Sequence, residues 1–232
     1  MPMVSRTGPT MLLVHGGFAD AALWSAVVAQ LWEAGVAVRA ADNPLHSLDV
    51  DAAHVAAAAR GIAGPVLLAG HGYGGAVITG AAAQAGNAVG LVYVAGYALD
   101  AGESVDDVNR RFPPAQLPTA GGPDTRVRID PDAFAAAFAA DLPASVAASM
   151  AASQRGIAPE CLTGRAAGAA WRTLPSWYLI AADDRLVHPQ AQRFMAQRAG
   201  ARTSETAGSH AVAVSQPTAV VDLMLTAANV LA

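Results

Sequence analysis

Short apolar runs alternate along this chain with longer segments that have helical periodicity. Short apolar runs of this kind are typical of strands buried on both faces of a parallel sheet, and the intervening helices are typical of crossover connections. We therefore predict an α/β fold with about six mainly parallel strands flanked by helices. The strands are expected at 11–14, 36–40, 66–69, 88–95, 176–181 and, more weakly, 201–206, and the helices at 22–34, 49–62, 74–86, 189–199 and 216–230.

One long segment, residues 100–171, interrupts this alternation. It begins with a cluster of prolines and glycines between 113 and 123 and continues with helical patterns near 131–141 and 143–154. A short strand-like stretch at 126–129 is the only sign of extended structure. Insertions of this kind commonly cover the functional end of a sheet. We predict a single domain over 1–232 with a helical cap at 100–171.

Composition and charge narrow the functional classes. The 232 residues are 53% hydrophobic, which suits one domain with a sizeable core. The net charge of -4 and the lack of a basic run argue against a nucleic-acid partner. The single cysteine, Cys161, excludes an intrachain disulfide, and the apolar run at 11–14 is too short for a signal peptide. We expect a cytoplasmic monomer or homodimer that binds a small molecule, with no membrane span, cofactor or metal.

Two glycine-rich loops follow predicted strands. The stretch "LLAGHGYGGAV" (67–77) resembles a G-x-S-x-G nucleophile elbow, but its central position is Gly72 instead of serine. In such an elbow the next N–H, here that of Tyr73, donates to a developing oxyanion. The loop "HGGF" (15–18) follows the first strand, and Gly17 or Phe18 is expected to supply the second donor.

Acidic residues and a histidine follow the last two strands. Asp183 and Asp184 come after the strand that ends at 181, and His210 comes after the weak last strand. The carboxyl ends of parallel strands lie at the same edge of a sheet, where active sites of such folds are found. The order of nucleophile position, acid and histidine matches the α/β-hydrolase triad. At this stage either aspartate could be the acid.

Four stretches carry a resemblance to a known family: "LLVHGGFADAALW", "LLAGHGYGGAVI", "SWYLIAADDRLVHP" and "GSHAVAVSQP". They resemble α/β-hydrolases of the compact esterase branch that includes plant methyl esterases and hydroxynitrile lyases. The resemblance implies that Gly72 occupies the nucleophile position, Asp184 is the acid and His210 is the base. Two residues depart from the pattern, because Gly72 replaces the serine and Gly156 stands where relatives often have proline.

Aromatic residues near these loops and in the predicted cap indicate an apolar pocket. We expect His71, Tyr97, Phe112, Phe134 and Phe138 to contribute to substrate binding, with a supporting role in the scaffold as the alternative for His71. Phe18 and Tyr73 add aromatic surface beside them. A small or medium apolar or aromatic carboxylic ester is the substrate class that such a pocket favours.

Three functions remain open because Gly72 has no side chain. The first is a serine-type carboxylic ester hydrolase whose nucleophile has been replaced, and the third is a non-catalytic ligand-binding protein. The second is an enzyme without a covalent intermediate, in which Asp184 and His210 act as a general-base pair beside an oxyanion hole in direct hydrolysis, a lyase reaction or proton transfer. Glycine adopts the strained elbow conformation without a Cβ penalty, so the fold should tolerate it. In a well-studied serine protease, loss of the nucleophile lowers turnover by about 10⁶-fold.

Overall fold

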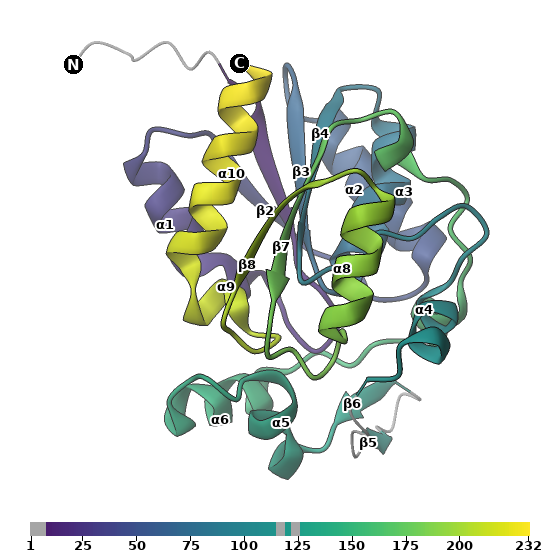
Figure 1. Ribbon diagram of the computed structural model, residues 1–232, viewed down its shortest axis with the longest axis vertical. Helices are drawn as coiled ribbons and strands as arrows, with labels where there is room; N and C mark the ends of the chain where they lie inside the picture. Colours follow the sequence, from purple (N-terminus) through teal and green to yellow (C-terminus); the bar gives the residue numbers. More distant parts are fainter. Residues whose placement is uncertain (1–7, 115–118, 122–125) are drawn as a thin grey trace.

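The computed structural model describes residues 8–114, 119–121 and 126–232. Its centre is a six-stranded sheet in the order β2-β1-β3-β4-β7-β8, and every neighbouring pair is parallel (Figure 1). The predicted α/β fold is therefore confirmed. The strands are β1 Thr10–Val14, β2 Val38–Ala41, β3 Val66–His71, β4 Ala88–Val94, β7 Ser176–Ala181 and β8 Arg202–Thr206.

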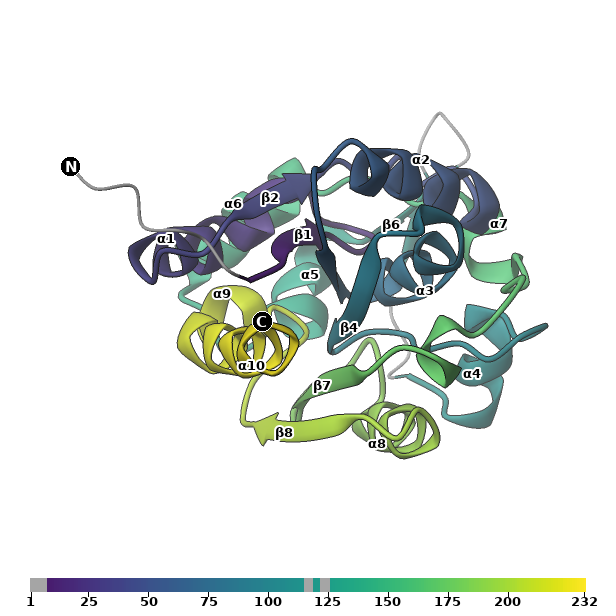
Figure 2. The ribbon, with the colours of Figure 1, turned by 90° about the horizontal axis from the view of Figure 1, so that it is seen from above.

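Helices cover both faces of the sheet (Figure 2). The alternating side chains of β1 divide between two apolar cores, with Met11 and Leu13 on one face and Leu12 and Val14 on the other. One face is covered by η1 Ala21–Trp24, α1 Ser25–Glu33, α9 Val212–Ser215 and α10 Pro217–Leu231, and the other by α2 Leu48–Arg60, α3 Tyr73–Ala85 and α8 Pro189–Arg198. This two-sided burial explains why the inner strands are continuous apolar runs.

The strands differ in how clearly the sequence predicts them. All six residues of β3 are buried, and the strand carries no charged residue. The edge strand β8 pairs only with β7 and exposes most of its residues, which are Arg202, Thr203, Ser204, Glu205 and Thr206. An edge strand needs fewer apolar side chains because one of its sides faces solvent. Its sequence signal is correspondingly weak.

The segment 100–171 divides between two locations. Helices α5 Pro131–Phe138 and α6 Ala144–Ser153 lie beyond the carboxyl ends of the strands, below the sheet in Figure 1. Helices α4 Val105–Arg111 and α7 Pro159–Thr163 instead pack on each other and on α8 and α2, beside the sheet, and the short η2 Ala170–Arg172 contacts α3. The strand-like stretch near 126–129 forms β6 Val127–Ile129, which pairs antiparallel with β5 Thr119–Gly121. The single domain and the cap boundaries at 100–171 stay predictions.

Among the helices of the described ranges, none combines the length and the apolar character that a membrane crossing needs.

Candidate active site

Gly72 lies in the sharp turn between β3 and α3. Its φ of 52° and ψ of -124° fall in a region that L-residues rarely adopt. The Gly72 N–H donates to the carbonyl of Val94 (3.2 Å), and the Gly72 carbonyl accepts from the N–H groups of Gly75 and Tyr97 (3.0 Å each). The turn has the sharp backbone that the predicted elbow requires, and its central residue has no side chain.

Two neighbouring glycines make this turn possible. A Cβ on Gly70 would lie 2.4 Å from the carbonyl oxygen of Gly74, and a Cβ on Gly74 would lie 2.5 Å from the carbonyl oxygen of Val14. Both contacts are far shorter than van der Waals distance, and both are with backbone atoms that cannot move independently. The start of α3 thus packs directly on the ends of β1 and β3.

Asp184 and His210 form a buried pair at the carboxyl ends of β7 and β8. His210 Nδ1 donates to Asp184 Oδ2 (2.8 Å), which also accepts from Gln192 Nε2 (2.9 Å). Asp184 Oδ1 accepts from the N–H groups of Leu186 (2.8 Å) and Val187 (3.0 Å). Because Nδ1 carries the proton, the lone pair of His210 is on Nε2.

Asp183 has a different partner. Its carboxylate accepts from the N–H of Gly208 at 3.2 Å, which ties the two loops together below β7 and β8. The hydrogen bond to the His210 ring belongs to Asp184.

The His210 ring fills the space beside Gly72. A Cβ on Gly72 would lie 2.9 Å from His210 Nε2 and 3.1 Å from Cε1. The ring is held there by His71 and Phe138, whose ring centroids lie 4.4 Å and 4.9 Å from that of His210. The basic nitrogen therefore faces the nucleophile position, and a larger residue at position 72 requires a small displacement of the ring.

His71 supports the loop that carries His210. The side chain is completely buried, and its Nε2 donates to the His210 carbonyl (2.7 Å). Burial, and secondarily the nearby His210, hold the pKa of His71 well below its usual value, so the ring is neutral. Within the described residues its Nδ1 has no hydrogen-bond partner. The structure therefore gives His71 a packing and tethering role beside the candidate base.

The three residues predicted for the oxyanion hole differ in their availability. Tyr73 is the first residue of α3, so its N–H lies outside the intrahelical hydrogen-bond ladder. Phe18 has a φ of 62°, and its N–H already donates to the carbonyl of Arg155 (3.1 Å). Of the two alternatives in the first loop, Gly17 is the better candidate. Its Cα is covered by Ile157, whose Cδ1 would lie 3.0 Å from a Cβ on Gly17.

His15, the first residue of this loop, orients it. Its Nδ1 donates to the Gly16 carbonyl (2.9 Å), and its Nε2 accepts from the Asn43 N–H (3.1 Å). In a trans peptide the C=O and the N–H point in opposite directions. The bond to the Gly16 carbonyl therefore fixes the direction of the Gly17 N–H. Burial lowers the pKa of His15, which favours the neutral ring that this arrangement requires.

The aromatic residues predicted to bind substrate pack against different neighbours within the described residues. Tyr97 is buried and its hydroxyl donates to Asn109 Oδ1 (2.9 Å). Phe134 is buried and stacks on Phe138 (5.0 Å between centroids). Phe112 packs on Phe194 of α8 (5.3 Å). The ring contacts of His210 come from His71 and Phe138 alone among these five residues.

No metal-binding cluster of three or more His, Cys, Asp or Glu side chains occurs within residues 8–114 and 126–232. Both carboxylate oxygens of Asp184 already accept two hydrogen bonds each. The arrangement is suited to orienting a histidine.

Comparisons with known proteins agree with the fold. Residues 11–223 match the family model described as the alpha/beta hydrolase family. One similar solved structure is a methylesterase from Arabidopsis, with a TM-score of 0.79 and 17% identity, and the match covers 96% of this chain and 100% of that chain. Another is polyneuridine aldehyde esterase, with a TM-score of 0.78 and 18% identity, and the match covers 94% of this chain and 99% of that chain. A pyrethroid hydrolase from Sphingobium faniae is also similar (0.75, 20%, 95% and 97%). No curated protein matches the sequence. The chain belongs to the alpha/beta hydrolase family.

Proposed function

We propose that this chain carries a carboxylic-ester site of the serine-hydrolase type in which glycine replaces the nucleophile. In this proposal a small or medium apolar ester binds but does not form an acyl-enzyme. The observation that carries the proposal is the position of His210, whose Nε2 would lie 2.9 Å from a Cβ on Gly72 while Asp184 holds Nδ1. The similar structures include proteins named as esterases and a pyrethroid hydrolase, which supports ester chemistry.

Each remaining group has a role that fits ester cleavage. Asp184 holds the tautomer of His210, and His210 would take the proton of a hydroxyl at position 72. The N–H groups of Gly17 and Tyr73 would stabilise the oxyanion of a tetrahedral intermediate. Only the attacking oxygen is absent. Loss of the nucleophile alone lowers turnover by about 10⁶-fold in a serine protease, or roughly 8 kcal/mol of activation free energy.

The non-covalent alternative requires a water or a substrate oxygen between His210 and Gly72. A water oxygen must lie about 2.8 Å from Nε2 and also clear the Gly72 Cα. A Cβ on Gly72 would lie 2.9 Å from Nε2, so a water in this space would lie beside the ring, within hydrogen-bond range of Nε2. The similar structures named as esterases and as a pyrethroid hydrolase favour the missing-nucleophile function over the general-base function.

A pure binding function is less well supported than ester chemistry. The buried Asp184 and His210 pair is costly to desolvate, and a binding protein gains nothing from orienting a base.

The test compares Gly72→Ser with Gly72→Ala on a short-chain aryl acetate. We expect the serine variant to hydrolyse the ester several orders of magnitude faster than wild type, up to about 10⁶-fold, and to be labelled at position 72 by a serine-directed phosphonate. The alanine variant meets the same contact with His210 but lacks the hydroxyl, so it should stay inactive. Circular dichroism of both variants checks that they are folded.

One result would overturn this proposal. If the folded serine variant is as slow as the alanine variant, while wild type hydrolyses the ester and His210→Ala stops it, the glycine belongs to a working non-covalent mechanism.

A further inference from the structure

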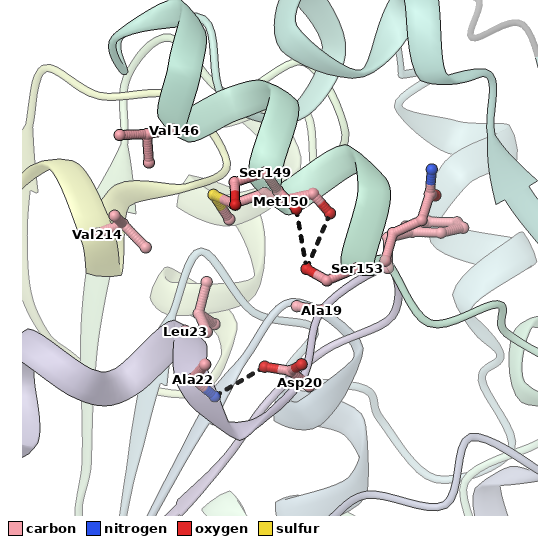
Figure 3. A pocket seen from close by; sticks show the side chains of 11 residues that line it. Ala19, Asp20, Ala22, Leu23, Val146, Ser149, Met150, Ser153 and Val214 are labelled. Carbon is pink, nitrogen blue, oxygen red and sulfur yellow. Dashed lines mark hydrogen bonds between the residues drawn. The ribbon is translucent and has the colours of Figure 1, made fainter.

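A cavity of about 270 Å³ lies between η1 and α6 (Figure 3). Its walls come from three segments: the loop and helix that follow Gly17, the α6 helix, and α9, which follows His210. The lining residues that the argument uses are Phe18, Asp20, Leu23, Ser149, Met150 and Val214.

The cavity adjoins the candidate site through the chain itself. Phe18 directly follows Gly17, and Val214 lies in α9, four residues after His210 in the chain. Phe18 also packs against the apolar cores on both sides of the sheet. Phe18 thus lines the cavity and also belongs to the loop 15–18, which contains Gly17. The positive φ of Phe18 is held by the hydrogen bond from its N–H to Arg155.

The side chains of Asp20, Ser153 and Gln154, which line the cavity, already have partners within the protein. Asp20 accepts from the Ala22 N–H (2.8 Å), and Ser153 Oγ donates to the Ser149 carbonyl (3.1 Å), as Figure 3 shows. The Gln154 amide pairs with the N–H (3.0 Å) and the carbonyl (2.9 Å) of Ile129. What remains for a ligand is the apolar surface of residues such as Leu23, Met150 and Val214, together with the Ser149 hydroxyl. The Asp20 carboxylate disfavours an anion.

The size of the cavity sets the size of the group that fits. An engineered cavity of about 150 Å³ in another protein binds benzene. The 270 Å³ here accommodates one substituted aromatic ring or a short branched alkyl chain.

We propose that this cavity binds the uncharged hydrocarbon part of the ester, with its carbonyl directed past Phe18 toward the N–H groups of Gly17 and Tyr73. The inference rests on the proposed function, because it assigns the cavity to the same ligand. It assigns specificity to η1 and α6 instead of to the aromatic residues near His210.

Binding to the intact wild-type protein tests the inference, because the missing nucleophile allows an uncleaved ester to be titrated. The probe is methyl benzoate, followed by isothermal calorimetry, with benzoate as the charged comparison. Ser149→Phe places a ring in the cavity, whereas Ala148→Phe places the same ring on the neighbouring exposed position that does not line it. We expect Ser149→Phe to weaken binding at least tenfold and Ala148→Phe to change it by less than twofold. Benzoate should bind more weakly than the ester.

A second filling variant guards against a local distortion of α6. Val146→Phe fills the cavity from another exposed position on the same helix and should weaken binding in the same direction. Equal affinity in wild type, Ser149→Phe and Val146→Phe, or no binding of methyl benzoate to wild type, would overturn the inference.

The outcomes also separate this inference from the proposed function. If the filling variants weaken ester binding and the Gly72→Ser variant is inactive, the ester binds in the cavity but the proposed function is rejected. An active Gly72→Ser variant whose ester affinity the filling variants leave unchanged supports the function and rejects the cavity.

Discussion

Asp184 belongs to the histidine side of the candidate site and Gly70 to the turn that contains Gly72, and different kinds of contact hold these two sides. Asp184 accepts hydrogen bonds from His210, Gln192, Leu186 and Val187, so its position depends on directional polar contacts. Gly70 is held by the absence of a side chain, because the backbone of Gly74 occupies the place where a Cβ would be.

This difference predicts that substitutions on the two sides have different consequences, one for activity and the other for stability. A change that keeps the shape of Asp184 but alters its hydrogen-bonding character should remove chemistry and leave the fold largely intact. A change that adds even one carbon at Gly70 should act on the fold first, because backbone atoms must separate to admit it.

The largest effect is expected for Asp184→Asn in the Gly72→Ser background. Aspartate fixes the productive tautomer of His210, and the corresponding substitution in a serine protease lowers turnover by about 10⁴-fold. We expect a loss of similar size in aryl acetate hydrolysis, with the far-ultraviolet circular dichroism spectrum unchanged.

Asp183→Asn is the matched control, because its carboxylate accepts from the Gly208 N–H and does not reach the His210 ring. Its hydrolysis rate should stay within a few-fold of the parent. If Asp183→Asn lost activity and Asp184→Asn did not, the assignment of the acid would be reversed.

The next effect is on stability and concerns Gly70→Ala. The added Cβ would meet the Gly74 carbonyl oxygen at 2.4 Å, so we expect the free energy of unfolding to fall by about 3 kcal/mol or more. Urea denaturation followed by tryptophan fluorescence measures this change. Gly168→Ala is the control, because no atom lies within 4 Å of its Cβ position, and it should change stability by less than about 0.5 kcal/mol. Equal stabilities would show that the elbow backbone relaxes easily.

The smallest effect is a pH dependence of the free energy of unfolding. It arises from His71, which directly precedes Gly72 and donates to the His210 carbonyl. Its pKa in the folded protein lies below that of the unfolded chain, which is about 6.5. Above that pH both states are neutral and the residue makes no difference. As the pH falls below about 6.5, the unfolded chain takes up the proton first, so the free energy of unfolding falls by up to about 1.4 kcal/mol per pH unit. His15 acts in the same direction.

Urea denaturation at pH 8, 6.5 and 5.5 measures this slope. His71→Gln should reduce it, because the group whose pKa is lowered has been removed. His54→Gln, at an exposed position on α2, should leave it unchanged. Identical slopes in wild type and His71→Gln would show that His71 does not control the pH dependence.

Much of the fold could be predicted because burial on two faces leaves a direct record in the sequence. The apolar run that begins at 66 and the helical pattern that follows Gly72 correspond to β3 and α3. The segment 100–171 was harder, because α5 and α6 lie at the strand ends while α4 and α7 pack beside the sheet. Helical periodicity indicates that a face is buried, but it does not indicate which surface buries it.

The sequence predicts which loops form the candidate site, but it predicts less well which side chains contact one another there. Phe112 and Phe134 are of a residue type that is typical of ligand pockets. In the structure Phe112 packs on Phe194, and Phe134 packs on Phe138. Arg155 and Ile157 lie far along the chain from the loop 15–18. Nothing in their local sequence indicates that they contact Phe18 and Gly17.

The sequence by itself determined that a glycine stands at the elbow and that an aspartate pair and His210 follow later strands. These loops meet because parallel strands end at one edge of a sheet. Only the tertiary structure decided that Asp184 accepts the hydrogen bond from His210 Nδ1, that the His210 ring fills the space beside Gly72 and that Ile157 covers Gly17. Such choices depend on differences of a few tenths of an ångström between segments remote in the chain, and these distances are set by close packing.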